Sequence, residues 1–249
     1  MLTVRSVPAA GVVAQLAVLA ALATTVGLSF AGWVVGVSCG VVTNTGVTRG
    51  LARYARALGP ADVVTLTRVT LAGGVAGLVA DAFLQQPALA PLLALTVAAL
   101  VLDAVDGLVA RRTGTASLFG ARFDGEADAF LILVLSVFVA RTVGGWVLAI
   151  GAARYAFAVG GWVLPWLRAP LPPRYWRKVV AATQGVVLTL AAAGFLPHPV
   201  TALALGLALA LLTESFGRDV LWLWRRRRTI RVEAAVDDAP QSGIRAGNT

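Results

Sequence analysis

The chain has 249 residues, of which 58% are hydrophobic and 13% are charged, and its formal net charge is +9. Soluble domains average about 45–50% apolar and about 25% charged residues, so this composition excludes a soluble globular domain, a coiled coil and a disordered chain. It predicts an all-α, polytopic integral membrane protein. The single cysteine, Cys39, excludes an intrachain disulfide.

The first apolar run extends from Ala9 to Val42. A bilayer core needs about 20 apolar helical residues, so the run is too long for one span and short for two. We expect residues 1–47 to form a membrane hairpin that breaks near Gly27–Phe30. A cleaved signal peptide with Arg5 in its charged region is the alternative, but the apolar run continues well past any cleavage site, which favours the hairpin.

Residues 48–59 have the pattern of an amphipathic helix. Arg49, Arg53 and Arg56 lie within about 60° of one another on a helical wheel, with Leu51 among the apolar residues opposite. This pattern predicts an interfacial helix on the anionic cytoplasmic leaflet.

Six further apolar segments predict a membrane-spanning catalytic core over residues 60–228. They cover residues 62–81, 91–110, 122–140, 143–166, 179–196 and 200–223. Trp222, Trp224 and the arginines that follow predict an anchor at the end of the last span. We expect residues 229–249 to form a disordered cytoplasmic tail.

The distribution of basic residues predicts the orientation. With the N-terminus inside, eighteen of the 21 basic residues fall in inside segments and only Arg141 falls outside. This positive-inside bias accounts for the basic charge without a nucleic-acid partner. We therefore expect a protein of the cytoplasmic membrane of a prokaryote, with its active site facing the cytoplasm.

Acidic residues gather at the cytoplasmic ends of two successive spans. Asp103 and Asp106 share an arc of about 100° with Gly107 and Ala110 on a helical wheel, so two carboxylates adjoin two positions with almost no side chain. A carboxylate inside a span costs at least about 2.5–3.5 kcal/mol on insertion scales, which makes such groups candidates for function.

Asp124 and Asp128 lie four residues apart on the next helix and share a face. Four carboxylates directed at one another repel strongly at low dielectric, and Mg²⁺ or Mn²⁺ would neutralise them. The alternative is that the acids pair with Arg111, Arg112 and Arg122 at the helix ends, which is a weak explanation for four acids at these spacings.

The segment from Asp103 to Asp128 resembles the CDP-alcohol phosphotransferase signature at every fixed position. The fixed residues are Asp103, Asp106, Gly107, Ala110, Arg111, Gly120, Asp124 and Asp128. The upstream segment also resembles the first core span of the family. That span commonly has a polar residue, a threonine and an arginine at the positions of Asp62, Thr65 and Arg68. The likeness covers roughly residues 57–228 and leaves the N-terminal hairpin outside it.

This resemblance implies an activity and a division of labour among the residues. Family members transfer the phosphatidyl group of CDP-diacylglycerol to an alcohol, or a phosphoalcohol to diacylglycerol, and release CMP. Two divalent ions, Mg²⁺ or Mn²⁺, would be held by Asp103, Asp106 and Asp124. Asp128 would be a further metal ligand, the catalytic base, or both. The nucleotide would be bound by Thr65, Gly107, Ala110 and Arg111.

Basic residues near the acids favour a phosphorylated acceptor. Arg154 lies in the middle of a span, and Arg122 and Lys178 occupy places where family members line a pocket for an acceptor phosphate. We therefore expect an acceptor such as glycerol 3-phosphate or inositol phosphate. The alternative for Arg154 is a pairing with Glu214 or Asp219. Glu126 is expected to face away from the metals, toward Arg122.

The sequence thus predicts a metal-dependent phosphatidyltransferase of phospholipid biosynthesis that acts on CDP-diacylglycerol and a small alcohol within membrane lipid. Transfer of a phosphoalcohol from a CDP-alcohol to a lipid is the alternative reaction. A divalent-cation transporter is disfavoured because the acids gather near one face, and a non-catalytic member because the signature is intact. Homodimers are common in the family.

Overall fold

A computed structural model describes residues 7–54, 59–113, 118–169, 171 and 175–237. Their regular secondary structure is entirely helical, as predicted. The α-helices are α1 (Val7–Val26), α2 (Phe30–Tyr54), α3 (Pro60–Asp81), α4 (Leu89–Thr113), α5 (Leu118–Val143), α6 (Leu148–Val163), α7 (Tyr175–Ala193) and α8 (His198–Asp237). Two short 3₁₀ helices, η1 (Gly145–Val147) and η2 (Pro165–Arg168), flank α6.

The break between α1 and α2 falls where the sequence predicts it. Gly27 has a φ of 74°, a left-handed conformation that glycine adopts without a steric penalty. At this turn the Asp81 carboxylate, at the end of α3, accepts hydrogen bonds from the first backbone amides of α2. Ser29 N and Gly32 N donate to it at 2.9 and 3.1 Å. The hairpin is therefore fixed to the helix that begins the predicted core.

Two segments differ from the expectation. Residues 48–54 continue α2 instead of forming a separate interfacial helix, and Leu51 is 1% exposed because it packs on Phe119 of α5. A helix with one apolar face can lie on a membrane surface or pack against another helix, and the sequence pattern is the same in both cases. At the other end, α8 continues to Asp237, so residues 229–237 of the expected disordered tail are helical. The remaining tail, 238–249, lies outside the described residues.

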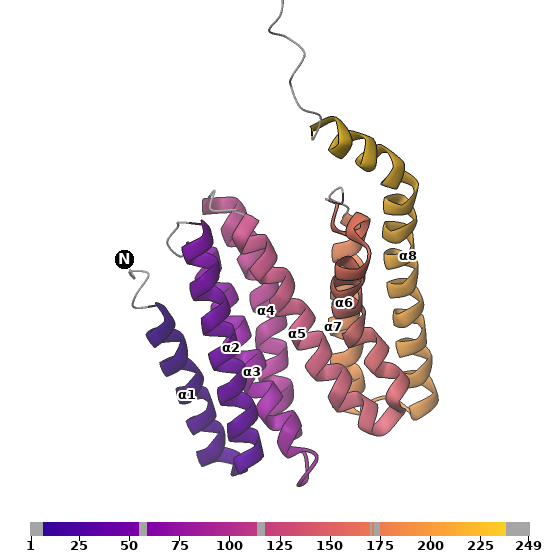
Figure 1. The fold of residues 1–249 in the computed structure, drawn as a ribbon. Coiled ribbons are helices and arrows are strands. Elements are labelled where there is room, and N and C mark those ends of the chain that lie inside the picture. Colours follow the sequence, from indigo (N-terminus) through magenta and orange to yellow (C-terminus); the bar gives the residue numbers. More distant parts are fainter. Residues whose placement is uncertain (1–6, 55–58, 114–117, 170, 172–174, 238–249) are drawn as a thin grey trace, which may run out of the picture.

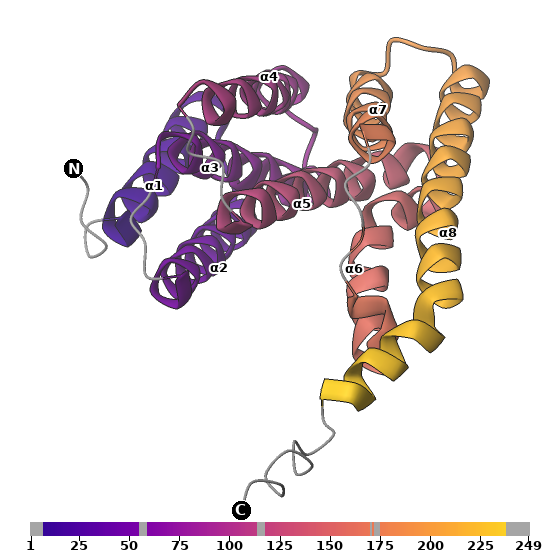
Figure 2. The same ribbon diagram turned by 90° about the horizontal axis from the view of Figure 1, so that it is seen from above.

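The helices form two groups joined by α5. Helices α1 to α4 pack together, α6 to α8 pack together, and α5 runs between the two groups (Figures 1 and 2). A continuous apolar core connects the groups through fully buried leucines, among them Leu19, Leu92, Leu135, Leu188 and Leu205. Gly77 of α3 lies so near α2 that an added Cβ would meet the Gly32 carbonyl oxygen at 3.0 Å.

The outer surface is apolar, as a lipid environment requires. Within the described residues, four helices are long and apolar enough to cross a membrane, with spans over Phe30–Ala52, Asp62–Asp81, Gly145–Val163 and His198–Arg227. Large apolar side chains lie exposed on such helices, including Phe30 at 84% and Val163 at 76% exposure. Near the end of α8, Arg226 and Arg227 stack on Trp222 and Trp224, the pairing of cation and indole that suits a membrane interface.

Candidate active site

The first two turns of α3 present a buried polar face. Asp62, Thr65 and Arg68 follow at intervals of three residues, and each is 2–3% exposed. Asp62 caps its own helix, because its Oδ2 accepts a hydrogen bond from Gly59 N at 2.8 Å. This end of α3 packs against α4 and α5, so its polar side chains enter the bundle where the acidic residues of those helices lie.

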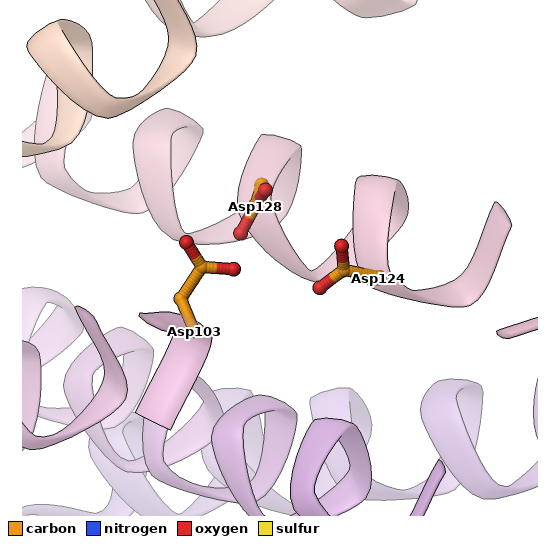
Figure 3. Close-up of side chains that lie close together, drawn as sticks. All are labelled: Asp103, Asp124 and Asp128. Carbon is orange, nitrogen blue, oxygen red and sulfur yellow. The ribbon is translucent and has the colours of Figure 1, made fainter. Parts of the chain in front are cut away.

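Three aspartates from two helices converge beside this face. Asp103 of α4 and Asp124 and Asp128 of α5 each place a carboxylate oxygen within 4.8 Å of the others, and Figure 3 shows Asp103 pointing toward α5. We call these three residues the acid triad. Asp124 and Asp128 lie on adjacent turns of α5, as their spacing predicts. The carboxylates are 33–39% exposed.

Arg68 joins all three members of the acid triad. Its Nη2 lies 2.8 Å from Oδ1 of Asp103, and its guanidinium also donates to Oδ1 of Asp124 and Oδ1 of Asp128. The acids reach the protein surface, whereas the Arg68 side chain is 3% exposed and approaches from the buried side. One cation from α3 therefore links the facing ends of α4 and α5.

The acid triad has the donor chemistry of a site for hard divalent cations. Its ligands are carboxylate oxygens, which Mg²⁺ and Mn²⁺ prefer, and histidine and cysteine are absent from this described cluster. Two carboxylates 4.8 Å apart repel by about 3 kcal/mol at an effective dielectric of about 20. Three carboxylates against one guanidinium leave an excess of negative charge that a divalent ion would reduce.

Several predicted site residues lie partly or wholly outside this description. The backbone of α4 passes through Asp106, Gly107, Ala110 and Arg111, but their side chains lie outside the described residues. Thr65 is buried on α3, one turn before Arg68. The structure thus brings three of the four predicted metal ligands together and places Thr65 on the adjoining helix.

The start of α5 is supported by the extension that precedes the core. Phe119 packs against Val47 and Leu51 of α2, and it stacks on Phe123 with ring centroids 5.9 Å apart. An added Cβ on Gly50 would overlap the Phe119 ring. The N-terminal extension therefore helps to position the turn of α5 that carries Asp124.

Arg154 has a different partner from either acid considered for it. Its Nη2 lies 2.6 Å from Oε1 of Glu126, and the two side chains are 44% and 60% exposed. The alternative pairing of Arg154 with Glu214 or Asp219 is therefore wrong. Helix α6 approaches the α5 backbone closely at Gly151, and an added Cβ on Gly125 of α5 would meet Nη2 of Arg154 at 3.2 Å. This packing of α6 on α5, which spacing within one helix does not reveal, brings Arg154 to Glu126.

The acids first considered for Arg154 pair elsewhere. Asp219 of α8 accepts a hydrogen bond at Oδ1 from Nη2 of Arg177 on α7, at 3.1 Å, and Glu214 pairs with Arg218 at 2.9 Å. The Arg177–Asp219 pair links α7 to α8 beside Lys178, whereas the Glu214–Arg218 pair lies within α8.

The two other predicted acceptor residues lie near the acids. Lys178 is exposed on α7 and within electrostatic range of Asp103. Arg122 is exposed on α5, two residues before Asp124.

Fold and site together define an all-helical integral membrane protein with a carboxylate cluster suited to divalent cations. A sequence model of the CDP-alcohol phosphatidyltransferase family matches residues 58–213, which is more than half of the chain. The chain therefore belongs to this family, whose members transfer a phosphatidyl or phosphoalcohol group from a CDP-alcohol. No curated protein and no solved structure matches the chain. The matched range begins at α3 and contains the acid triad, with α1 and α2 outside it.

Proposed function

We propose that the protein transfers the phosphatidyl group of CDP-diacylglycerol to a small phosphorylated alcohol and releases CMP, as a step of phospholipid biosynthesis. The observation that carries this proposal is the acid triad, because Asp103, Asp124 and Asp128 converge from two helices within the residues that the family model matches. Glycerol 3-phosphate and an inositol phosphate are the acceptors that we expect.

In this reaction the acceptor hydroxyl attacks the phosphorus that carries the diacylglycerol. A new phosphorus–oxygen bond forms, the bond to the CMP oxygen breaks, and CMP leaves with that electron pair. Asp128 is placed to accept the hydroxyl proton, acting as the general base beside its role in binding the cation. A carboxylate in this role must stay free to take up a proton, and its 33% exposure leaves one side open to substrate.

The remaining residues bind and orient the two substrates. Asp103, Asp106 and Asp124, with Asp128, would hold two Mg²⁺ or Mn²⁺ ions. The chemistry that such ions supply is neutralisation of the diphosphate and of the leaving CMP. On the donor side, the nucleotide would lie against the small residues of α4. We assign its binding to Thr65, Gly107, Ala110 and Arg111.

A phosphorylated acceptor fits the cations on the flanks of the acid triad. Lys178 approaches from α7 on the side of Asp103, and Arg154 approaches from α6 beside Gly125. Arg122 adds a third positive charge on α5. Both Arg154 and Glu126 are partly exposed, so an acceptor phosphate can reach the guanidinium and replace the Glu126 carboxylate.

The protein would cross the cytoplasmic membrane of a prokaryote with α3 to α8 as a six-span core and α1 and α2 as a preceding hairpin. The positive-inside bias supports this orientation. It puts the acid triad near the cytoplasmic face, where water-soluble acceptors are available. A homodimer is compatible with this arrangement.

The test is CMP release by the purified full-length protein with CDP-diacylglycerol and Mg²⁺ or Mn²⁺. Glycerol 3-phosphate and inositol phosphate should support release, whereas unphosphorylated glycerol and inositol serve as matched controls. Asp128→Asn should lose on the order of 10²–10⁴-fold in turnover. Label in the diacylglycerol should enter the product if the phosphatidyl group is transferred, and label in the headgroup if a phosphoalcohol is transferred. Absence of CMP with every acceptor, or full activity of Asp128→Asn, would contradict the proposal.

A further inference from the structure

Arg68 contacts the same carboxylates that would hold the divalent cations. Its guanidinium meets one oxygen of each member of the acid triad, and its side chain is almost completely buried between α3, α4 and α5. A guanidinium stays charged at any physiological pH, so this positive charge cannot be removed by loss of a proton. A permanent cation therefore lies against all three carboxylates of the acid triad.

The geometry of the Arg68 side chain suits it to act as the counter-ion of several carboxylates. The planar guanidinium carries several N–H donors in a fixed fork, and Nη1 and Nη2 together serve three carboxylates. These contacts hold Asp103 on α4 and Asp124 and Asp128 on α5 together, although their charges repel. Without such a cation, only a bound metal ion could offset the repulsion among these carboxylates.

We infer that Arg68 is a built-in counter-ion that keeps the acid triad assembled without metal and gives up at least one carboxylate when a divalent cation binds. The inference rests on the proposed function, because it takes the acid triad as the cation site. Arg68 is here a positioning residue that acts through the three aspartates. Since the guanidinium and the metal compete for the same oxygens, Arg68 lowers the affinity for divalent cations and keeps binding reversible.

The experiment measures Mn²⁺ binding to the full-length protein in detergent, without donor or acceptor. The signal of free Mn²⁺ in electron paramagnetic resonance gives the affinity and the number of ions bound. Arg68→Gln removes the competing charge, so we expect it to bind Mn²⁺ at least about tenfold more tightly than the unmodified protein. The matched control is Arg141→Gln, which removes the same charge at the other end of α5, and its affinity should be unchanged. Unchanged or weaker binding by Arg68→Gln would overturn the inference.

A second variant serves if Arg68→Gln does not fold. Arg68→Lys keeps the charge, but one ammonium group cannot serve three carboxylates with the geometry of the guanidinium. We expect it to bind Mn²⁺ about threefold more tightly than the unmodified protein, and to gain more thermal stability than that protein when Mn²⁺ is added. Equal affinity and an equal gain in stability would overturn the inference.

Failure of this inference is distinct from failure of the proposed function. If Asp124→Asn removes Mn²⁺ binding but the Arg68 variants bind as the unmodified protein does, the cation site stands and the role of Arg68 is wrong. Failure of the transferase proposal is instead an absence of CMP release, which these binding measurements do not involve.

Discussion

Acidic side chains lie near both ends of α3, and they differ in their burial and in their partners. At the end of α3, Asp81 is 4% exposed and accepts hydrogen bonds from Ser29 N, Ser29 Oγ, Gly32 N and Gln85 Nε2. Three of these donors belong to the start of α2, where unpaired amides and the helix dipole favour an anion. The charge of Asp81 is therefore stabilised by uncharged hydrogen-bond donors, most of them in the hairpin turn.

The acid triad has the opposite arrangement at the start of α3. Its three carboxylates are partly exposed, and all three contact the guanidinium of Arg68. Four donors satisfy the one carboxylate of Asp81, whereas the acid triad shares the Arg68 guanidinium among three carboxylates. The difference indicates that a carboxylate with complete local partners holds the fold together, and that carboxylates in excess over their cation are available to bind a ligand.

The largest expected effect comes from replacing one acid near each end of α3 by its amide. Asp124→Asn should reduce CMP release by about 10³-fold, because the change removes a proposed ligand of the ion that would neutralise the diphosphate. Asp81→Asn should keep its turnover but lose about 1–3 kcal/mol in free energy of unfolding, because the amide nitrogen would face amide donors. Turnover assays and thermal unfolding of both variants in detergent give the two quantities.

The two variants are controls for each other, since both exchange a carboxylate for an amide on a helix. A loss of activity in Asp81→Asn equal to that in Asp124→Asn would contradict the distinction between the two ends. So would a loss of stability confined to Asp124→Asn.

The sequence predicts which residues share a helix face, but not which faces meet. Spacing along one helix brought Asp124 and Asp128 to one side, and the signature related them to Asp103, so the acid triad was predictable. The four-way contact of Arg68 with these acids depends on how α3, α4 and α5 are rotated about their axes. The pairing of Arg154 with Glu126 likewise depends on the crossing of α6 over α5. The three-residue spacing of Asp62, Thr65 and Arg68 was the available signal for a polar face on α3.

A smaller effect is expected at the proposed acceptor site. Arg154→Ala should raise the KM for the phosphorylated acceptor by about 10- to 100-fold, because a charge-assisted hydrogen bond to phosphate is worth about 1.5–3 kcal/mol. The KM for CDP-diacylglycerol should change by less than about twofold, since we assign donor binding to α3 and α4. Initial rates with each substrate varied in turn measure both constants.

The partner of Arg154 provides the control for that experiment. Glu126→Gln breaks the same ion pair but leaves the guanidinium in place, so it should not raise the KM for the acceptor. Equal increases in Arg154→Ala and Glu126→Gln would mean that the ion pair acts only as a link between α5 and α6. Equal effects of Arg154→Ala on donor and acceptor would also reject the assignment.

The smallest expected effect concerns the contact of α2 with α5, which supports the acid triad. Asp81 fixes the opposite end of α2, at the hairpin turn. A Cβ on Gly50 overlaps Phe119, whose side chain is 7% exposed and has little room to move, whereas a Cβ on Gly46 of the same helix meets nothing within 4 Å. Gly50→Ala should cost about 1–3 kcal/mol by overpacking, while Gly46→Ala should gain about 0.5–1 kcal/mol from helix propensity. Because the displaced turn carries Asp124, Gly50→Ala should also lower turnover several-fold and Gly46→Ala should not. If both alanine variants had the same stability and the same turnover, the extension would have no part in positioning α5.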